Sequence, residues 1–324
     1  AEPAAAAGWE TVASLERPRA FARAVALPDG DILVVGGLDP ADPEVVTYRS
    51  ELIEAATGRV TVLPQPLLGR VNHSATAGWG DRVVVAGGTE WRGTHWGAVD
   101  RVEVYLPDSR TWLRGAPLSV ARSDHGAVAL TDGRILVTGG NQGSALLRST
   151  EIYDPATDRW SAAAPLPRPR TQFSIARLPD GRVLVAGGFR EDGRITDTTA
   201  IYDATTDRWS AGPRRLDARR NHAMVTLPGG DLLFVGGEAG ASGTAERYDF
   251  RRGRFVDAGR LASPRLVPQA AVQVTGRQSL AYHHRIRPLA PAHHRTPPAT
   301  GSRFGAATSR DSRSARRISS LRVT

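Results

Sequence analysis

The sequence predicts an all-β protein built from repeated units of four antiparallel strands. Gly-Gly pairs close apolar runs at intervals of 51, 52, 48 and 49 residues along the 324-residue chain. A fixed period near fifty residues marks a repeat architecture. The 34 glycines and 22 prolines suit many short strands joined by tight turns better than long helices. The five pairs are Gly36-Gly37, Gly87-Gly88, Gly139-Gly140, Gly187-Gly188 and Gly236-Gly237.

Each repeat is expected to begin with a hairpin of two apolar strands. The run before the glycine pair, such as ILVV or VLVA, is long enough for a buried strand. A dipeptide that accepts positive φ stands before four of the five runs and predicts a two-residue turn. These dipeptides are Asp29-Gly30, Asp132-Gly133, Asp180-Gly181 and Gly229-Gly230.

A second hairpin is expected in the other half of each repeat. Tyr153 precedes Trp160 by seven residues, with Asp154-Pro155 as turn chemistry between them. Large aromatic side chains on paired strands suit packing against a neighbouring sheet. The same interval joins Tyr105 to Trp112, Tyr202 to Trp209 and Tyr248 to Phe255, with Ile53 and Val60 in these places in the first unit.

Gly-Gly, Tyr-Asp-Pro and Trp in units near fifty residues together resemble the kelch repeat. The Arg-x-x-His start and the DGRVLVAGG strand are similar to its bacterial form, and to the central domain of galactose oxidase. The resemblance covers about residues 9–265 and implies a kelch-type β-propeller with blades around a central channel. Some kelch-like oxidases carry copper beside a Tyr-Cys crosslink, which a chain without cysteine cannot form.

We predict six blades, of which five are complete and the sixth is incomplete. The outer-strand aromatic precedes the next repeat's Arg by ten residues, and this spacing also joins Trp9 to Arg19 and Phe255 to Arg265. The ring is therefore expected to close with an N-terminal outer strand at 9–15, which would cover open sheet edges. The propeller spans 1–275, with repeats at about 19–63, 70–115, 122–164, 170–212 and 219–259, and a partial sixth from 265.

Residues 276–324 differ in composition from the repeats. They hold ten of the 42 basic residues and one of the 33 acidic residues, so the first 275 residues are neutral and the net charge of +9 comes from the tail. Such a segment, rich in Arg, Ser, Pro and His, is expected to be disordered. One hypothesis is a shifted reading frame; the alternative is a genuine basic tail, and only then is nucleic acid a partner.

An arginine recurs 17 residues before the first glycine of every pair. If these side chains converge at one mouth of the channel, they could hold a carboxylate or a phosphate. The other interpretation is that each arginine braces its own blade, which is what a residue present in every repeat usually does. The arginines are Arg19, Arg70, Arg122, Arg170 and Arg219, with Arg265 next in the series.

Three histidines, His73, His125 and His222, follow their arginines by three residues. Imidazole is a common metal ligand, so three of them around one axis could form a metal site. Repeated internal hydrogen bonds are the other interpretation and the one we favour. We therefore predict no metal.

The loops after Gly-Gly differ between repeats and lie on the same side as the arginines. The second loop holds Trp91, His95 and Trp96 outside the repeat pattern. Tryptophans beside polar residues suit stacking on a sugar or a hot spot for a protein partner, or they anchor the loop itself. We predict a non-catalytic kelch-repeat module whose variable loops bind a protein or a glycan. The alternative is a carbohydrate-active enzyme, similar to kelch-type sugar mutarotases or epimerases, with an arginine-lined anion site at the channel mouth.

Standard catalytic motifs do not occur in the sequence. There is no phosphate-binding loop, HExxH or GxSxG, and no lysine to form a Schiff base, so no cofactor is predicted. No apolar run approaches the roughly 20 residues of a membrane helix. The opening AEPAAAAG resembles the segment after a cleaved signal, which favours a secreted or cell-surface location over a cytoplasmic one. A monomer is expected.

Overall fold

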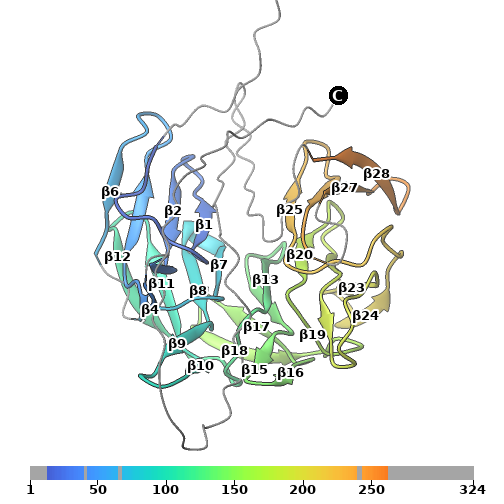
Figure 1. The fold of residues 1–324 in the computed structure, drawn as a ribbon, viewed down its shortest axis with the longest axis horizontal. Helices are drawn as coiled ribbons and strands as arrows, with labels where there is room; N and C mark the ends of the chain where they lie inside the picture. The colour runs from blue at the N-terminus through green and yellow to red at the C-terminus, as the bar shows by residue number, and fades with distance from the viewer. Residues whose placement is uncertain (1–12, 40–41, 65–67, 239–242, 262–324) are drawn as a thin grey trace, which may run out of the picture.

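The computed structural model describes residues 13–39, 42–64, 68–238 and 243–261. Over these residues the chain forms five four-stranded antiparallel sheets in sequence order. Figure 1 shows the sheets as blades arranged in an arc, with the innermost strands toward the centre and the outermost strands at the rim. The predicted all-β propeller with five complete blades is confirmed.

Each blade pairs its four strands in chain order from the inside outward. The blades consist of β1 (Arg23–Ala26), β2 (Ile32–Val35), β5 (Ser50–Ile53) and β6 (Val60–Val62); β7 (Ser74–Ala77), β8 (Val83–Ala86), β11 (Val102–Leu106) and β12 (Thr111–Gly115); β13 (Gly126–Ala129), β14 (Ile135–Thr138), β17 (Thr150–Asp154) and β18 (Arg159–Ala163); β20 (Ser174–Arg177), β21 (Val183–Ala186), β23 (Thr199–Asp203) and β24 (Arg208–Ala211); and β25 (Ala223–Thr226), β26 (Leu232–Val235), β27 (Thr244–Asp249) and β28 (Arg254–Arg260).

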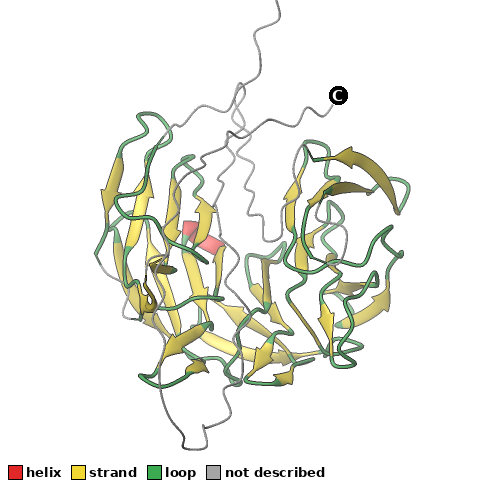
Figure 2. Cartoon of the chain, in the orientation of Figure 1, coloured by secondary structure: helices red, strands yellow, loops and turns green. Residues whose placement is uncertain are grey.

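Short two-stranded ribbons branch from four of the blades at the loops after Gly-Gly, and in the fourth blade the loop pairs with the arginine turn of the same blade. In the described part of the chain the helical structure consists of one short turn, η1 (Trp79–Asp81), as Figure 2 shows. That turn is too short to cross a membrane, and no other described segment is helical. The ribbon strands are β3 (Leu38–Asp39) with β4 (Asp42–Val46), β9 (Thr89–Trp91) with β10 (Trp96–Ala98), β15 (Asn141–Gln142) with β16 (Ala145–Leu146), and β19 (Arg170–Thr171) with β22 (Phe189–Arg190).

The core lies between the faces of consecutive blades. The second strand of each blade is almost entirely buried, and its alternate side chains face opposite neighbours. In β8, Val83 and Val85 pack toward the first blade, while Val84 packs with Ile135 and Val137 of the third. Such strands therefore read as continuous apolar runs in the sequence.

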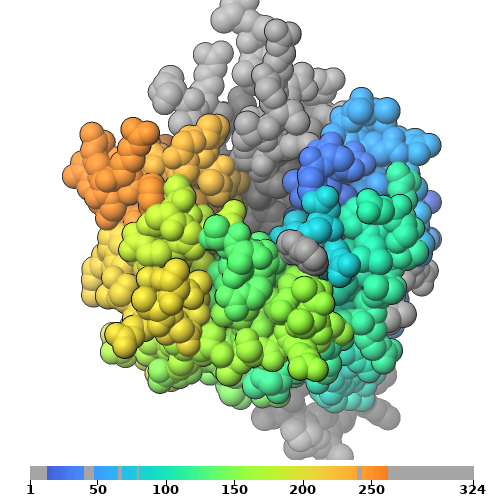
Figure 3. Space-filling model, turned by 180° about the vertical axis from the view of Figure 1, so that it is seen from behind, coloured from blue at the N-terminus to red at the C-terminus, as the bar shows by residue number. Residues whose placement is uncertain are grey.

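The predicted Tyr–Trp pairs tie neighbouring blades together at the rim. Tyr153 and Trp160 are directly paired across β17 and β18, with ring centroids 4.9 Å apart. The Trp160 indole N–H donates to the carbonyl of Ala116 in the preceding blade, at 2.8 Å. Trp209 makes the same bond to Ala164, at 2.7 Å. Figure 3 shows how closely the middle blades abut when the molecule is viewed from behind.

Most of the predicted sixth blade lies outside the described residues, including Trp9, Arg265 and the whole of 276–324. Of the expected N-terminal strand at 9–15, the described residues 13–15 are not in a strand. Ala13 and Leu15 nevertheless pack against the core of the first blade, beside Ile32 and Ile53.

Candidate functional site

The repeated arginines are buried inside the blades. Arg70 is 1 % exposed and donates to the carbonyls of Gly87 (3.0 Å) and Arg101 (2.8 Å). It also forms an ion pair with Glu103 on β11. Arg122 repeats this arrangement with Glu151, at 2.6 Å. Arg19 pairs with Glu51, Arg219 lies near Glu246, and Arg170 binds neutral oxygens of its own blade. This geometry favours bracing over a ring open to a ligand.

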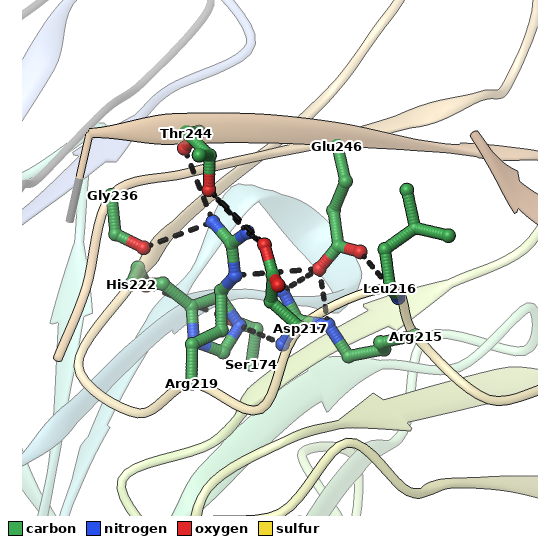
Figure 4. Close-up of polar contacts among 9 residues, drawn as sticks. All are labelled: Ser174, Arg215, Leu216, Asp217, Arg219, His222, Gly236, Thr244 and Glu246. Atoms are coloured by element: carbon green, nitrogen blue, oxygen red, sulfur yellow. Dashed lines mark hydrogen bonds and ion pairs between the residues drawn. The ribbon is translucent and has the colours of Figure 1, made fainter. Parts of the chain in front are cut away.

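The fifth blade has a second arginine at its glutamate, drawn in Figure 4. Arg215 donates from Nε to Glu246 at 2.6 Å, and Glu246 also accepts the backbone N–H of Leu216 at 2.9 Å. Arg219 lies 3.4 Å from the same carboxylate and binds Asp217 at 3.2 Å. The charges of this cluster are therefore satisfied within the blade.

The arginine carbonyls join consecutive blades. In the first four pairs the second glycine donates its N–H to the arginine carbonyl of the next repeat, as from Gly88 to Arg122 at 2.8 Å. The first glycine has a positive φ, and a Cβ on Gly87 would lie 2.5 Å from that same carbonyl oxygen. Gly-Gly is therefore required by the close approach of the next blade.

The three histidines are wedged between blades. His73, His125 and His222 are 1 %, 7 % and 8 % exposed. The His125 Nε2 shares a hydrogen bond with the Ser74 hydroxyl (2.9 Å), and Arg215 donates to His222 Nε2 (3.0 Å). Burial holds the pKa of each imidazole well below its usual value, so the rings are neutral at pH 7. Over the described residues no group of three His, Cys, Asp or Glu side chains could hold a metal ion.

The residue two places after each arginine lies in the left-handed region, which sequence reasoning missed. Its φ is between 51° and 57°. Three backbone hydrogen bonds connect four of these positions from blade to blade: Asp124 N–H to Asn72 O (3.0 Å), Gln172 N–H to Asp124 O (3.1 Å) and Asn221 N–H to Gln172 O (3.0 Å). The phase of the arginine series would have located them. The five residues are Phe21, Asn72, Asp124, Gln172 and Asn221.

Asp124 is the ionisable member of this set. Burial raises the pKa of its carboxyl group to about 6, against the opposing effect of the Arg23 and Arg220 guanidinium groups. Arg23 lies on β1 and donates to the His73 carbonyl at 2.8 Å. Arg220 binds Glu238 and covers the Phe189 ring at 5.1 Å. Charged groups from three blades thus act on one another.

The loops after Gly-Gly lie on the same face as the arginine turns. Isolated bridges join them directly, at Val71 with Thr89, Ser123 with Asn141 and Arg220 with Glu238. The ribbons of the first three blades also contact one another, β4 with β9 and β10 with β15. We call this side of the propeller the loop face.

The predicted tryptophans form a pair on the β9–β10 hairpin. Trp91 and Trp96 are directly opposite across the strands, with ring centroids 5.4 Å apart and planes tilted by 57°. Trp96 is 38 % exposed, and Trp91 is partly buried. His95 at the exposed turn hydrogen-bonds Thr94 at 3.1 Å, and Arg92 pairs with Glu90 at 2.9 Å. The hairpin therefore presents a preformed aromatic pair among charged groups.

Sequence reasoning also missed five equivalent positions, one in each blade, of which four hold the glutamate beside the buried arginine. Their distance from Gly-Gly changes with loop length, but each stands two residues before the tyrosine position of its repeat. This second reference point gives the glutamates Glu51, Glu103, Glu151 and Glu246, with Ala200 in the fourth blade.

Comparisons with known proteins agree with this architecture. Residues 22–237 match the KLHDC2/KLHL20/DRC7 Kelch-repeats domain family. The chain is a kelch-repeat protein and belongs to that family. It is also similar to Beta-scruin of Limulus polyphemus, with 32 % identity over 132 residues that cover 37 % of this chain and 13 % of Beta-scruin. The chain therefore matches only a small part of that relative.

Among solved structures, the chain resembles the one titled "Structure of YjhT", with a TM-score of 0.68 and 15 % sequence identity. The match covers 84 % of this chain and 100 % of that one. At this identity the likeness establishes the fold, a kelch β-propeller, and function has to be argued from the site.

Proposed function

We propose that this chain is a non-catalytic binding module that presents its loop face to a protein or glycan ligand. The observation that carries the proposal is the Trp91–Trp96 pair, which lies outside the repeat pattern on an antiparallel hairpin. Paired aromatic rings of this kind give a large contact area with little loss of side-chain entropy. Sugar rings and apolar protein side chains both stack on such surfaces.

The contrast between the recurring buried residues and the variable hairpins of the loop face supports the same proposal. The arginines, histidines and glycines that recur in each repeat are buried and bonded within or between blades. The hairpins on the loop face differ from blade to blade in length and charge. A rigid scaffold with variable loops is the arrangement that binding proteins use to change ligands without changing fold.

A screen of the purified chain against glycans and candidate proteins tests the proposal, repeated with Trp96→Ala. Loss of the Trp96 ring is expected to weaken binding at least tenfold, because exposed aromatic anchors dominate interface energies. Leu113→Ala is the matched control, since Leu113 lies on the outer strand of the same blade and is 51 % exposed. Equal affinity of the two variants for a ligand of the native chain would contradict the proposal.

One observation favours an enzyme acting on sugars as a second candidate. Burial raises the pKa of Asp124 to about 6, although the positive charges of Arg23 and Arg220 oppose this rise. A carboxyl group that titrates near neutral pH suits general acid–base catalysis. Polarimetry of fresh α- and β-anomers tests this candidate. Catalysed mutarotation that Asp124→Asn abolishes would favour it over the binding module.

A further inference from the structure

The fourth blade lacks the acid that accompanies the buried arginine in the other four. Glu51, Glu103, Glu151 and Glu246 lie beside the arginine clusters of their blades. On β23 the same place belongs to Ala200, which is 2 % exposed. Arg170 remains 3 % exposed, and within the described ranges it contacts no carboxylate.

Arg170 is held in the same frame as its counterparts. It donates to the carbonyls of Gly187 (3.3 Å) and Thr198 (3.1 Å) and lies 3.4 Å from the Thr198 hydroxyl. Arg122 makes the equivalent bonds in the third blade and adds the ion pair with Glu151. The contacts of the repeated arginine thus differ by one carboxylate between the two blades.

The fourth blade also lacks the backbone N–H group that donates to the carboxylate in other blades. In the third blade Glu151 also accepts the backbone N–H of Ser119 at 2.8 Å, and Glu246 accepts that of Leu216 in the fifth. The corresponding residue of the fourth blade is Pro167, which has no N–H to donate. Only the cation is therefore left needing an anionic partner.

A second cation, Arg190, lies beside Arg170 and increases the need for an anionic partner. Arg190 on β22 is directly paired with Arg170 on β19, so both side chains leave the ribbon on the same side. The Nε–H groups of both residues are buried without an acceptor. Burial and the like charge of Arg190 lower the pKa of Arg170 to about 10. The acid in contact with Arg190 is Asp192, at 3.1 Å and with a side chain 38 % exposed.

We propose that Arg170 and Arg190 form a binding site for a small carboxylate anion in the fourth blade. Glutamate differs from Ala200 by a CH₂–COO⁻ group, so a free anion the size of acetate restores what the other blades carry covalently. Bidentate carboxylate binding is the geometry that guanidinium groups favour. The partly exposed Arg190 side gives the anion its route from solvent. This site is separate from the Trp91–Trp96 hairpin and does not rest on the proposed function.

Thermal unfolding of the full chain at pH 7 and fixed ionic strength tests the site. Sodium acetate is exchanged for sodium chloride or sodium benzoate. A ligand that binds only the folded state raises the midpoint with the logarithm of its concentration above Kd. We expect a larger rise with acetate than with either salt. Equal rises would show an effect of ions in general and would overturn the proposal, as would a rise with benzoate alone, because the proposed site takes an anion the size of acetate.

Variants locate the effect. Ala200→Glu supplies the carboxylate covalently and is expected to abolish the acetate response, whereas Glu151→Ala creates an equivalent place in the third blade and is expected to enlarge it. Saturation-transfer NMR of acetate with the folded native chain and with Arg190→Gln gives a readout that does not depend on unfolding. At least a fivefold weaker signal-derived affinity is expected for Arg190→Gln. An acetate response that Ala200→Glu and Arg190→Gln both leave unchanged would place the anion elsewhere.

Discussion

The third and fourth blades have nearly the same structure and different buried chemistry. Their strands pair in the same order, and the rim aromatic pairs have ring centroids 4.9 and 5.0 Å apart. At the centre, the third blade has Arg122 with Glu151, while the fourth has Arg170 beside Ala200. The comparison shows that the ion pair is not needed to form a blade, because apolar strands and backbone bonds fix its geometry.

Two further positions differ between these blades in the same phase. His125 of the third blade is replaced by Phe173. Each ring packs against the first glycine of the preceding repeat, and its Cβ against the second glycine of its own repeat. Asp124 is replaced by Gln172, and both residues adopt a φ above 50°. The repeat thus specifies shape and backbone conformation at each place, and leaves charge free to vary.

The largest effect is expected from Glu151→Ala, which gives the third blade the residue that the fourth blade has at the equivalent position. Glu151→Ala leaves Arg122 buried without a counter-ion and the Ser119 N–H without an acceptor. Breaking a buried pair from one side typically costs about 3 to 5 kcal/mol of unfolding free energy. Urea unfolding followed by tryptophan fluorescence measures the loss.

Glu151→Gln is the control for that experiment, because its amide oxygen still accepts hydrogen bonds while the charge is gone. A loss below about 1 kcal/mol for Glu151→Ala would mean that the third blade tolerates the missing acid as the fourth does. The two blades would then not differ in their need for an anion.

Sequence analysis anticipated the blades because each strand, turn and rim aromatic repeats at a fixed interval. It singled out the loop that holds Trp91 and Trp96 because these two tryptophans lie outside the repeat pattern. It did not find the pairing of Arg122 with Glu151, since loops of unequal length separate the two positions in each blade. Nor could it show that Arg23 acts on the pKa of Asp124, because these residues are about a hundred positions apart in the sequence and only the curvature of the ring brings them near each other.

A smaller effect, a gain in unfolding free energy, is expected when Asp124 is replaced by a neutral residue. The equivalent residue of the fourth blade, Gln172, is already neutral. The folded-state pKa of about 6 exceeds the ordinary value of 3.8, so the folded state resists ionisation of this carboxyl group. Its stability cost is absent below pH 4, grows between pH 4 and 6, and is complete above pH 6. Asp124→Asn is expected to gain about 2 kcal/mol at pH 8, less than the full linkage because the side chain is partly exposed.

Unfolding by urea at pH 8 and at pH 4 measures this difference, and asparagine suits the site because Asn72 and Asn221 already adopt the same conformation. A gain that is equal at both pH values would assign the effect to the backbone and not to the charge. The comparison of Asp124 with Gln172 would then concern conformation alone.

His125 of the third blade and Phe173 of the fourth occupy equivalent positions, and they extend the comparison of the two blades to acid pH. Burial lowers the folded-state pKa of His125 well below 6.5, so its contribution to stability is complete above pH 6.5 and is lost as the pH falls below that value. His125→Phe, which copies Phe173, is expected to remove a loss of about 1 kcal/mol between pH 6.5 and 5.5. The change in unfolding free energy between these two pH values is the measurement.

Phe173→His is the reciprocal variant and is expected to add acid sensitivity to the fourth blade. His125→Phe also removes the hydrogen bond to Ser74, so its stability at pH 8 is compared separately. If both variants keep the native slope of stability against pH, protonation of these wedged rings does not contribute to acid unfolding.

The smallest effect is expected at Pro167, and it tests why the two changes in the fourth blade occur together. Pro167→Ser restores a backbone N–H on an exposed residue, but Ala200 offers it no acceptor. Water satisfies the new donor, so stability should change by no more than about 0.5 kcal/mol. In an Ala200→Glu background the same substitution gains the bond that Ser119 makes to Glu151. A coupling of at least about 0.5 kcal/mol in this double-mutant cycle is therefore expected. Strict additivity would show that proline and alanine at these places are independent, and that the carboxylate in the other blades serves its arginine alone.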